Sequence, residues 1–190
     1  MSQPSDHEPA LDPTLIIVSG QAGSGKTTLA HRLAHRIGCP AICRDEIKEG
    51  MVLSHGPGFQ AAVSDPLTAR TYPLFFATLA LLLEGGVTVV GEAAFQHPLW
   101  SRGLQPLRDL AKLRVVRCRA EDQVMLQRRR DRSATVATRA AHFDSGMLTI
   151  DPDWDPIHLE VPTLDVDTTD GYAPALEQIV SFATGHRAGS

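Results

Sequence analysis

The sequence predicts an α/β fold in which a parallel sheet is covered by helices on both faces. Short apolar runs that suit buried strands alternate along the chain with longer helical patterns. Glycines follow two of these helical patterns, at Gly38 and at Gly85 with Gly86, where the chain is expected to return to the sheet. The chain has 190 residues, which suits one hydrophobic core and is short for two ordinary domains.

A local signal places each expected element. Residues 15–18 form an apolar run, and a helical pattern over 26–37 follows them after a glycine-rich turn. The helical pattern over 73–84 ends at glycines, and the pattern over 120–132 ends in arginines, which suit a helix C-terminus. The other strands and helical patterns are bounded by turn or polar residues: strands at 40–43, 87–90, 114–118 and 163–166, and helices at 98–111 and 173–184.

Composition and termini indicate a cytoplasmic, globular protein. Hydrophobic residues make up 43% of the chain and charged residues 21%, and the net charge of −4 gives no general attraction to nucleic acid. The three cysteines have no metal-ligand spacing, and the longest apolar stretch, 74–83, is short for a membrane span. We expect residues 1–12 and 185–190 to be disordered, with a single domain over 13–184.

The segment between the first strand and the first helix has the spacing of a phosphate-binding loop. Gly20 is followed by four residues and then by Gly25, Lys26 and Thr27. Backbone N–H groups in such a loop, together with the helix dipole, bind phosphate oxygens. Lys26 is expected to reach the β and γ phosphates, and the Thr27 hydroxyl to bind Mg²⁺. The expected nucleotide contacts in this loop are Gly20, Ala22, Gly23, Ser24, Gly25, Lys26, Thr27 and Thr28.

Polar residues follow the second strand at the same edge of the sheet. The strand over 40–43 leads into Arg44 and Asp45, and the carboxyl ends of parallel strands share one edge with the phosphate loop. Asp45 is therefore expected to act on the hydroxyl of an acceptor, as a base or by orienting it. An alternative is that Asp45 only caps a helix that starts near Glu46. Arg44 and Lys48 flank Asp45 and are expected to contact the acceptor or to keep Asp45 ionised.

An acid also follows the third strand. Glu92 comes after the run over 87–90 and one glycine, where phosphate-loop enzymes usually carry an aspartate. It is expected to reach Mg²⁺ through water or to orient the acceptor. A carboxylate directly after a buried strand has little reason to be unpaired in a core.

Two further groups of residues are assigned to the site. Arg128 and Arg132 lie four residues apart at the end of a helical pattern and share a face, so both are expected to contact phosphate. The alternative is a solvated basic helix end. His55 and Arg70 lie in the segment 51–72 and are assigned to the acceptor pocket, against the alternative of ordinary polar residues.

These motifs resemble the small P-loop kinases of the polynucleotide-kinase-like, zeta-toxin-like and chloramphenicol-phosphotransferase-like group, which carry an AAA_33-type ATP-binding domain. The resemblance implies a three-layer fold with a five-stranded parallel sheet in the order 2-3-1-4-5. It implies Asp45 as the general base, with Lys48 in place of an arginine, and a lid over about residues 128–145. The adenine is then expected between this lid and the loop that contains Thr168.

The predicted function is ATP-dependent transfer of the γ-phosphoryl group to a hydroxyl of a small-molecule or nucleotide-like acceptor, with Mg²⁺. Lys26, Asp45 and Arg132 are the expected catalytic residues. Guanine use is not expected, because the chain has no Asn-Lys-x-Asp motif. The alternatives are a polynucleotide 5′-hydroxyl kinase and a nucleotide-dependent switch or ATPase that acts on a protein partner. Aromatic residues make up only 5% of the chain, which argues against an extended single-strand track.

Overall fold

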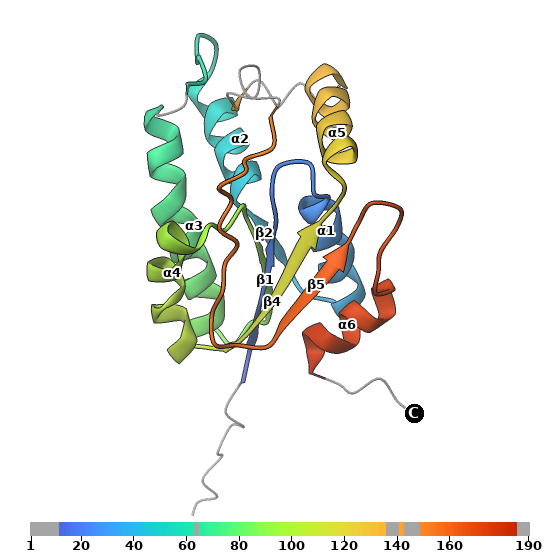
Figure 1. Cartoon of the computed structure of the whole chain (residues 1–190). Coiled ribbons are helices and arrows are strands. Elements are labelled where there is room, and N and C mark those ends of the chain that lie inside the picture. Colours follow the sequence, from blue (N-terminus) through green and yellow to red (C-terminus); the bar gives the residue numbers. More distant parts are fainter. Residues whose placement is uncertain (1–11, 63–64, 136–140, 143–148, 186–190) are drawn as a thin grey trace, which may run out of the picture.

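The computed structural model describes residues 12–62, 65–135, 141–142 and 149–185. The segments expected to be disordered therefore lie almost wholly outside the described residues, as does most of the expected lid beyond residue 135. A parallel five-stranded sheet forms the centre of the fold (Figure 1). Its strands are β1 (Thr14–Ser19), β2 (Ala41–Cys43), β3 (Val89–Glu92), β4 (Lys112–Arg119) and β5 (Thr163–Asp167).

The sheet has the strand order β2-β3-β1-β4-β5, which confirms the predicted topology. Every pairing between these strands is parallel. The carboxyl ends of all five strands therefore lie at the same edge of the sheet. The helices are α1 (Lys26–Ile37), α2 (Arg44–His55), α3 (Pro66–Glu84), α4 (His97–Leu104), α5 (Asp122–Thr135) and α6 (Leu176–Thr184), with a 3₁₀ helix η1 at Pro106–Asp109.

Two hydrophobic cores lie on opposite faces of the sheet. Alternate residues of β1 point to opposite faces, so Leu15 and Ile17 enter one core and Ile16 and Val18 enter the other. The first core packs against α3 and α4, and the second packs against α1 and α6 (Figure 1). The fold is thus the three-layer arrangement that the alternating sequence pattern predicted.

No helical pattern was predicted over the range of α2, and a helix that starts near Glu46 entered only through the alternative that Asp45 is its cap. Its residues RDEIKEGMVLSH give a weak apolar pattern, with a glycine in the middle, and the one fully buried side chain among them is that of Lys48. A helix whose buried face is polar gives no apolar periodicity for sequence reasoning to detect. Contacts to other elements must therefore position α2.

Prolines misled the prediction of two other helices. Helix α3 begins at Pro66, where Asp65 is the N-cap and its side chain accepts a hydrogen bond from the Thr68 N–H. The expected start at residue 73 is wrong, because Pro73 lies inside the helix. The predicted helix over 98–111 is divided, because Pro106 has no N–H to continue the ladder of hydrogen bonds.

Helix α3 also has the length and mean hydropathy of a membrane span. These two properties fit equally well a helix that packs on the core of a globular protein. Phe75, Leu79 and Leu83 of α3 pack in the same core as β1 and β3. The composition of α3 is therefore weak evidence for a membrane.

We expect Gly103→Ala to destabilise the protein by about 1–3 kcal/mol through overpacking. A Cβ at Gly103 in α4 would lie 2.3 Å from the ring of Phe76 in α3, so this ring, which packs against Tyr72 and Trp100, would have to move. Gly50→Ala in α2 is the matched control, because a Cβ there meets nothing within 4 Å. It should be neutral or stabilising by up to about 1 kcal/mol. Urea denaturation measures both, and equal effects would contradict the packing argument.

Candidate active site

The phosphate loop runs from the end of β1 to the first turn of α1. Gly20 and Gly23 both have positive φ values, of 152° and 88°. A Cβ at Gly20 would lie 2.5 Å from the carbonyl oxygen of Cys118, and one at Gly23 would lie 2.4 Å from that of Met125. Both glycines are therefore required by the close approach of neighbouring backbone. No acidic residue and no side-chain cap occupies the first turn of α1, which leaves its N–H groups for an anion.

Glu92 lies directly beside this loop. In the parallel register Glu92 of β3 is paired with Val18 of β1, so its side chain emerges next to the loop. Its carboxylate accepts a hydrogen bond from Thr27 Oγ1 at 3.2 Å and lies 3.7 Å from Lys26 Nζ. Only 1% of Glu92 is exposed. The structure therefore brings together the lysine, the hydroxyl and the acid that the sequence assigned to phosphate and metal.

Burial changes the acidity of Glu92. Burial raises its pKa, and the negative charge of Asp45 raises the pKa further. Contacts with Lys26, Thr27 and Cys43 lower the pKa but do not cancel the rise. A carboxylate in this position is stabilised by added positive charge. Glu92 and the Thr27 hydroxyl supply oxygen donors, which Mg²⁺ prefers, so the residues present fit a bound Mg²⁺.

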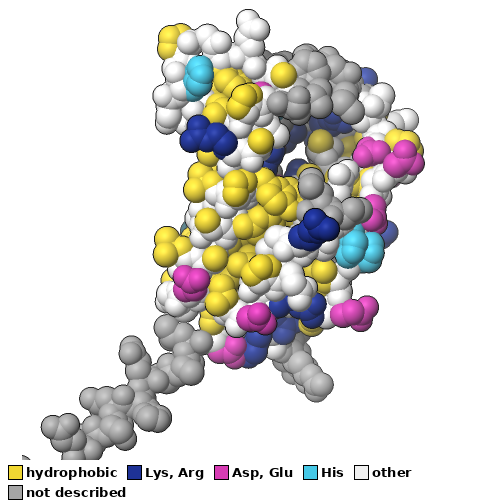
Figure 2. Space-filling view, turned by 90° about the vertical axis from the view of Figure 1, so that its left-hand side faces the viewer, with side chains coloured by type: hydrophobic (Ala, Val, Ile, Leu, Met, Phe, Trp, Pro, Cys, Tyr) yellow, Lys and Arg dark blue, Asp and Glu magenta, His cyan; other side chains and the backbone are white. Residues whose placement is uncertain are grey.

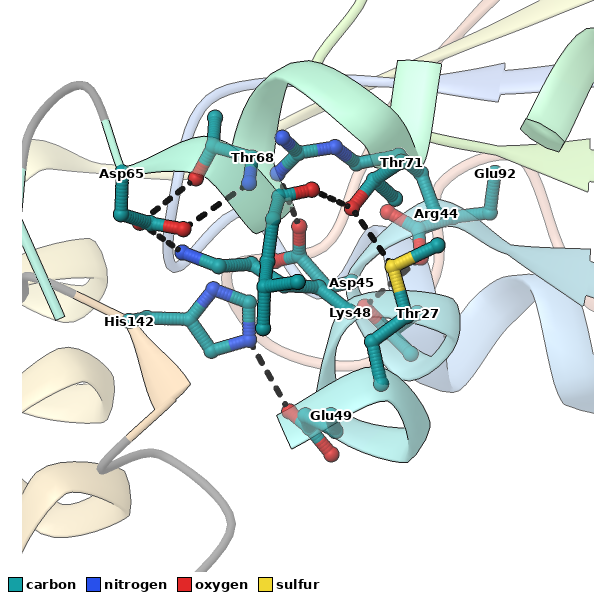
Figure 3. Close-up of polar contacts among 12 residues, drawn as sticks. Thr27, Arg44, Asp45, Lys48, Glu49, Asp65, Thr68, Thr71, Glu92 and His142 are labelled. Atoms are coloured by element: carbon teal, nitrogen blue, oxygen red, sulfur yellow. Dashed lines mark hydrogen bonds and ion pairs between the residues drawn. The ribbon is translucent and has the colours of Figure 1, made fainter. Parts of the chain in front are cut away.

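Asp45 lies on the other side of Glu92. Cys43 at the end of β2 is paired with Glu92 of β3, and Asp45 follows two residues later in the first turn of α2. Arg44 Nη1 donates a hydrogen bond to Asp45 Oδ1 at 3.0 Å. The N-cap of α2 is Cys43 and no side chain caps this helix, so the alternative in which Asp45 is only a cap does not hold. Figure 3 shows Asp45 between Thr27 and the start of α3.

The base of α2 is also held against α1. His31 Nε2 of α1 lies 2.7 Å from Glu46 Oε1 and 3.6 Å from Cys43 Sγ. This cluster of three side chains joins α1, the end of β2 and the first turn of α2. It fixes the turn that carries Asp45 relative to the phosphate loop.

Lys48 is bound by Asp65, the N-cap residue of α3. Its ammonium donates to Asp65 Oδ2 at 2.8 Å, and both side chains are only 3% exposed. Asp65 also accepts hydrogen bonds from the N–H and the hydroxyl of Thr68. Burial raises the pKa of Asp65, but the hydrogen bonds from Lys48 and Thr68 outweigh this effect and hold the pKa well below its usual range. Lys48 thus joins α2 to the start of α3 (Figure 3).

His55 and Arg70 are not brought together with Asp45. Both are exposed, and they line a groove of about 440 Å³ between α2 and α3. Successive helix residues are about 100° apart, so Ile47 and Ser54, which line the groove, lie about 160° and about 180° around α2 from Asp45. The groove therefore opens away from the face of α2 that carries Asp45.

Arg128 holds the loop after β5 against the phosphate loop. Its Nη2 donates to the carbonyl oxygens of Thr168 at 2.7 Å and of Thr169 at 3.2 Å. Thr168 Oγ1 in turn donates to the carbonyl oxygen of Ser24 at 2.7 Å. Arg128 and Thr168 therefore connect α5 and β5 to the phosphate loop, where the sequence placed the nucleotide.

Arg132 lies where the phosphate loop opens. A pocket of about 460 Å³ is lined by Gly23, Gly25, Thr28, Arg32, Arg128, Arg132, Thr168, Gly171 and Tyr172. A smaller hollow of about 40 Å³ is lined by Gly23, Gly25, Lys26, Thr27, Thr28 and Arg132. Arg132 borders both spaces, so its guanidinium is near the place where a larger ligand would meet the loop. The larger space has a volume that suits a nucleotide.

Comparison with known proteins agrees with this geometry. A family model described as an AAA domain, AAA_33, matches residues 15–150. The chain belongs to the AAA_33 family. No curated protein matches its sequence.

Solved structures resemble this AAA_33 domain over most of its length. A candidate kinase from Chloroflexus aurantiacus J-10-fl is 28% identical, with a TM-score of 0.79 over 92% of this chain and 98% of that chain. The Mycobacterium tuberculosis APS kinase has a TM-score of 0.62 at 16% identity, over 92% and 98% of the two chains. A gluconokinase from Sinorhizobium meliloti 1021 has a TM-score of 0.53 at 17% identity, over 92% and 93%. The predicted resemblance to the P-loop kinase group is confirmed.

Sequence reasoning missed several residues of this AAA_33 site. Arg32, Gly171 and Tyr172 line the larger pocket, and Arg32 Cζ lies 5.7 Å from the centre of the Tyr172 ring. Arg32 follows Thr28 by four residues on α1, so helix periodicity could have identified it. Nothing in the local sequence indicates the others. Glu49, which follows Asp45 by one turn, was also missed; it lies 3.2 Å from His142 Nε2.

We expect Glu92→Gln to increase the free energy of unfolding at neutral pH. A raised pKa means that folding favours the protonated carboxyl, so stability falls as the pH rises from the unfolded pKa, about 4.3, through the folded pKa. Glutamine is neutral at every pH and escapes this loss. Denaturation near pH 4 and pH 8 should show the advantage of the variant at the higher pH only. Exposed Glu160→Gln is the control, and an equal advantage at both pH values would contradict the argument.

We expect Lys48→Met to destabilise the protein by about 3–5 kcal/mol at neutral pH, because it leaves Asp65 charged and unpaired. The lowered pKa of Asp65 gives stability that is present above its unfolded pKa, about 3.9, and is lost as the pH falls through the folded pKa. The penalty of the variant should therefore shrink in acid. Lys112→Met removes an exposed ion pair with Asp12 and should cost less than about 1 kcal/mol. Chemical denaturation across pH measures both variants, and similar costs would refute this assignment.

Proposed function

We propose that this protein is an ATP-dependent phosphotransferase that moves the γ-phosphoryl group to a hydroxyl of a small-molecule or nucleotide-like acceptor. The observation that carries the proposal is the position of Asp45. Asp45 lies two residues after Cys43, which is paired in the sheet with Glu92, and Glu92 contacts Lys26 and Thr27 of the phosphate loop. A carboxylate in reach of the loop, but outside it, suits a residue that serves an acceptor.

One group of residues is assigned to ATP, the phosphoryl donor, and another to the acceptor. ATP would lie in the pocket between α1 and the loop after β5, with its phosphates at the N-terminus of α1. Lys26 and Arg132 would neutralise charge on the γ-phosphate. Thr27 and Glu92 would hold Mg²⁺, which supplies further charge neutralisation on the phosphates when bound.

Asp45 would handle the proton of the acceptor. As the acceptor oxygen forms its bond to the γ-phosphorus, the bond between that phosphorus and the β,γ-bridging oxygen breaks and ADP leaves. The hydroxyl proton passes to Asp45 Oδ2 or Oδ1. Arg44, which donates a hydrogen bond to Asp45 Oδ1, orients the carboxylate before the transfer.

A cytoplasmic location is part of the proposal. Cys39, Cys43 and Cys118 are all free thiols. Free cysteines are usual for proteins of the reducing cytoplasm, where ATP is also abundant.

The acceptor can be identified by a screen for ADP release. Nucleosides, sugars, antibiotics and short oligonucleotides are tested as acceptors with ATP, with and without Mg²⁺. We expect a small hydroxyl compound to stimulate ADP release only when Mg²⁺ is present. Stimulation by oligonucleotides alone would support a polynucleotide 5′-hydroxyl kinase. Stimulation by a protein and by no hydroxyl compound would support a switch and contradict our proposal.

We expect Asp45→Asn to slow single-turnover phosphoryl transfer by at least about 100-fold, because a general base typically contributes this much. ATP binding should remain, since Asp45 lies outside the phosphate loop, whereas Lys26→Ala should lose ATP binding and turnover. Asp109→Asn is the control, because this exposed aspartate lies in η1, near the start of β4 and away from the strand ends that carry the site. An unchanged rate of transfer by Asp45→Asn would contradict the assignment of Asp45 as the base. Turnover of ATP by Lys26→Ala would contradict the proposed kinase activity.

A further inference from the structure

One face of α3 is apolar and exposed. Leu74 is 45% exposed and Leu81 is 70% exposed, and Ala77 between them is also exposed. The residues that α3 buries are on its other side: Leu67, Thr71, Phe75, Leu79 and Leu83. Figure 2 shows hydrophobic side chains gathered on this face of the molecule. A helix with apolar residues on both sides is typical of one whose outer side is covered by a partner.

The charges of α3 lie only at its two ends. Among its 19 residues, Arg70 and Glu84 are the only charged ones. Both are exposed, and neither forms an ion pair with the part of the chain that the structure describes. They are separated by 14 residues, or about 21 Å along the helix axis. The two residues have opposite charges.

The exposed face has a helical repeat. Arg70, Leu74, Ala77, Leu81 and Glu84 are spaced by four, three, four and three residues. This spacing places them in one line along the helix, as in the seam of a coiled coil. The line has a small residue at its centre, a leucine on each side of that residue, and opposite charges at its ends. We call it the α3 stripe.

We propose that two copies of this chain associate through their α3 stripes, with the two helices antiparallel about a two-fold axis at Ala77. In a two-fold interface every contact occurs twice. If a residue of the first copy contacts another residue of the second copy, the same two positions also meet with the copies exchanged. Ala77 lies midway between Arg70 and Glu84, so Arg70 of each copy meets Glu84 of the other.

The same arrangement matches the apolar residues. Leu74 of one copy packs near Leu81 of the other, and the two Ala77 side chains let the helices approach closely at the crossing. A parallel pair would instead place like charges together, which is unfavourable. The α3 stripe is therefore complementary to itself in one orientation only.

The rest of the molecule is compatible with this association. A stable interface buries about 800 Å² on each partner. Arg70 and Leu74 of the α3 stripe also line the groove between α2 and α3, so a partner seated on the stripe would cover part of this groove as well. The nucleotide pocket is lined by α1, α5 and the loop after β5, and α1 covers the opposite face of the sheet. The proposed dimer thus leaves the nucleotide pocket open, and the inference does not depend on the proposed function.

Charge reversal tests the proposal. Sedimentation analysis over a range of concentrations should show a dimer for the wild type. Arg70→Glu and Glu84→Arg should each weaken dimerisation by at least about tenfold, because each places like charges together. The double variant should restore it, since the charges are exchanged but still matched. A monomeric wild type at all concentrations, or a double variant no better than the single ones, would overturn the proposal.

Crosslinking tests the position of the axis. Ala77→Cys should form a covalent dimer with a short bis-maleimide, because the two thiols would face each other. Glu177→Cys on α6, on the other face of the sheet, should form no covalent dimer under the same conditions, because the two thiols would lie far apart. Burial raises the pKa of the native Cys118 thiol to about 12, which keeps its background reaction low. Equal crosslinking of the two variants would contradict the proposal. A wild-type protein that is monomeric in solution and sediments with lipid vesicles would also contradict it, because the α3 stripe would then bind a membrane and not a second copy.

Discussion

The buried carboxylate of Glu92 is the contact on which the arrangement of the site depends. It lies at the end of β3, which is paired with β1 on one side and with β2 on the other. The register places Glu92 opposite both Val18, just before the phosphate loop, and Cys43, just before α2. A shift of one residue would move this side chain to the other face of the sheet. The proximity of the phosphate loop, Glu92 and Asp45 is thus a consequence of strand pairing.

The helices on the two faces of the sheet position different parts of the candidate site. On one face, α1 and the loop after β5 line the pocket that we assign to ATP, and Arg128 and Thr168 join that loop to the phosphate loop. On the other face, α3 anchors α2 through the ion pair of Lys48 and Asp65. A buried ion pair adds little net stability compared with apolar packing, but it fixes geometry when both partners have hydrogen bonds. Here that geometry is the direction of α2, and with it the position of Asp45.

Much of the fold could be predicted, and the errors have identifiable causes. Helix α1 has the predicted bounds because glycines mark both of its ends. Helix α2 was missed because its buried face is a lysine and not an apolar stripe. The start of α3 was misplaced because Pro73 has the typical signal of a first helical residue, whereas the cap at Asp65 is confirmed only by its hydrogen bond to Thr68. These are cases in which tertiary contacts outweigh the local pattern.

The sequence by itself determined the phosphate loop, the acids after β2 and β3, and the basic end of α5. Each follows from local backbone geometry and from the rule that parallel strands end at one edge. Only the tertiary structure decided that Lys48 turns to Asp65, that Arg70 and His55 line a separate groove, and that Tyr172 enters the pocket. The reason is that the rotation of a helix about its own axis decides which neighbour each of its side chains meets. This rotation depends on packing against residues that are distant in the sequence.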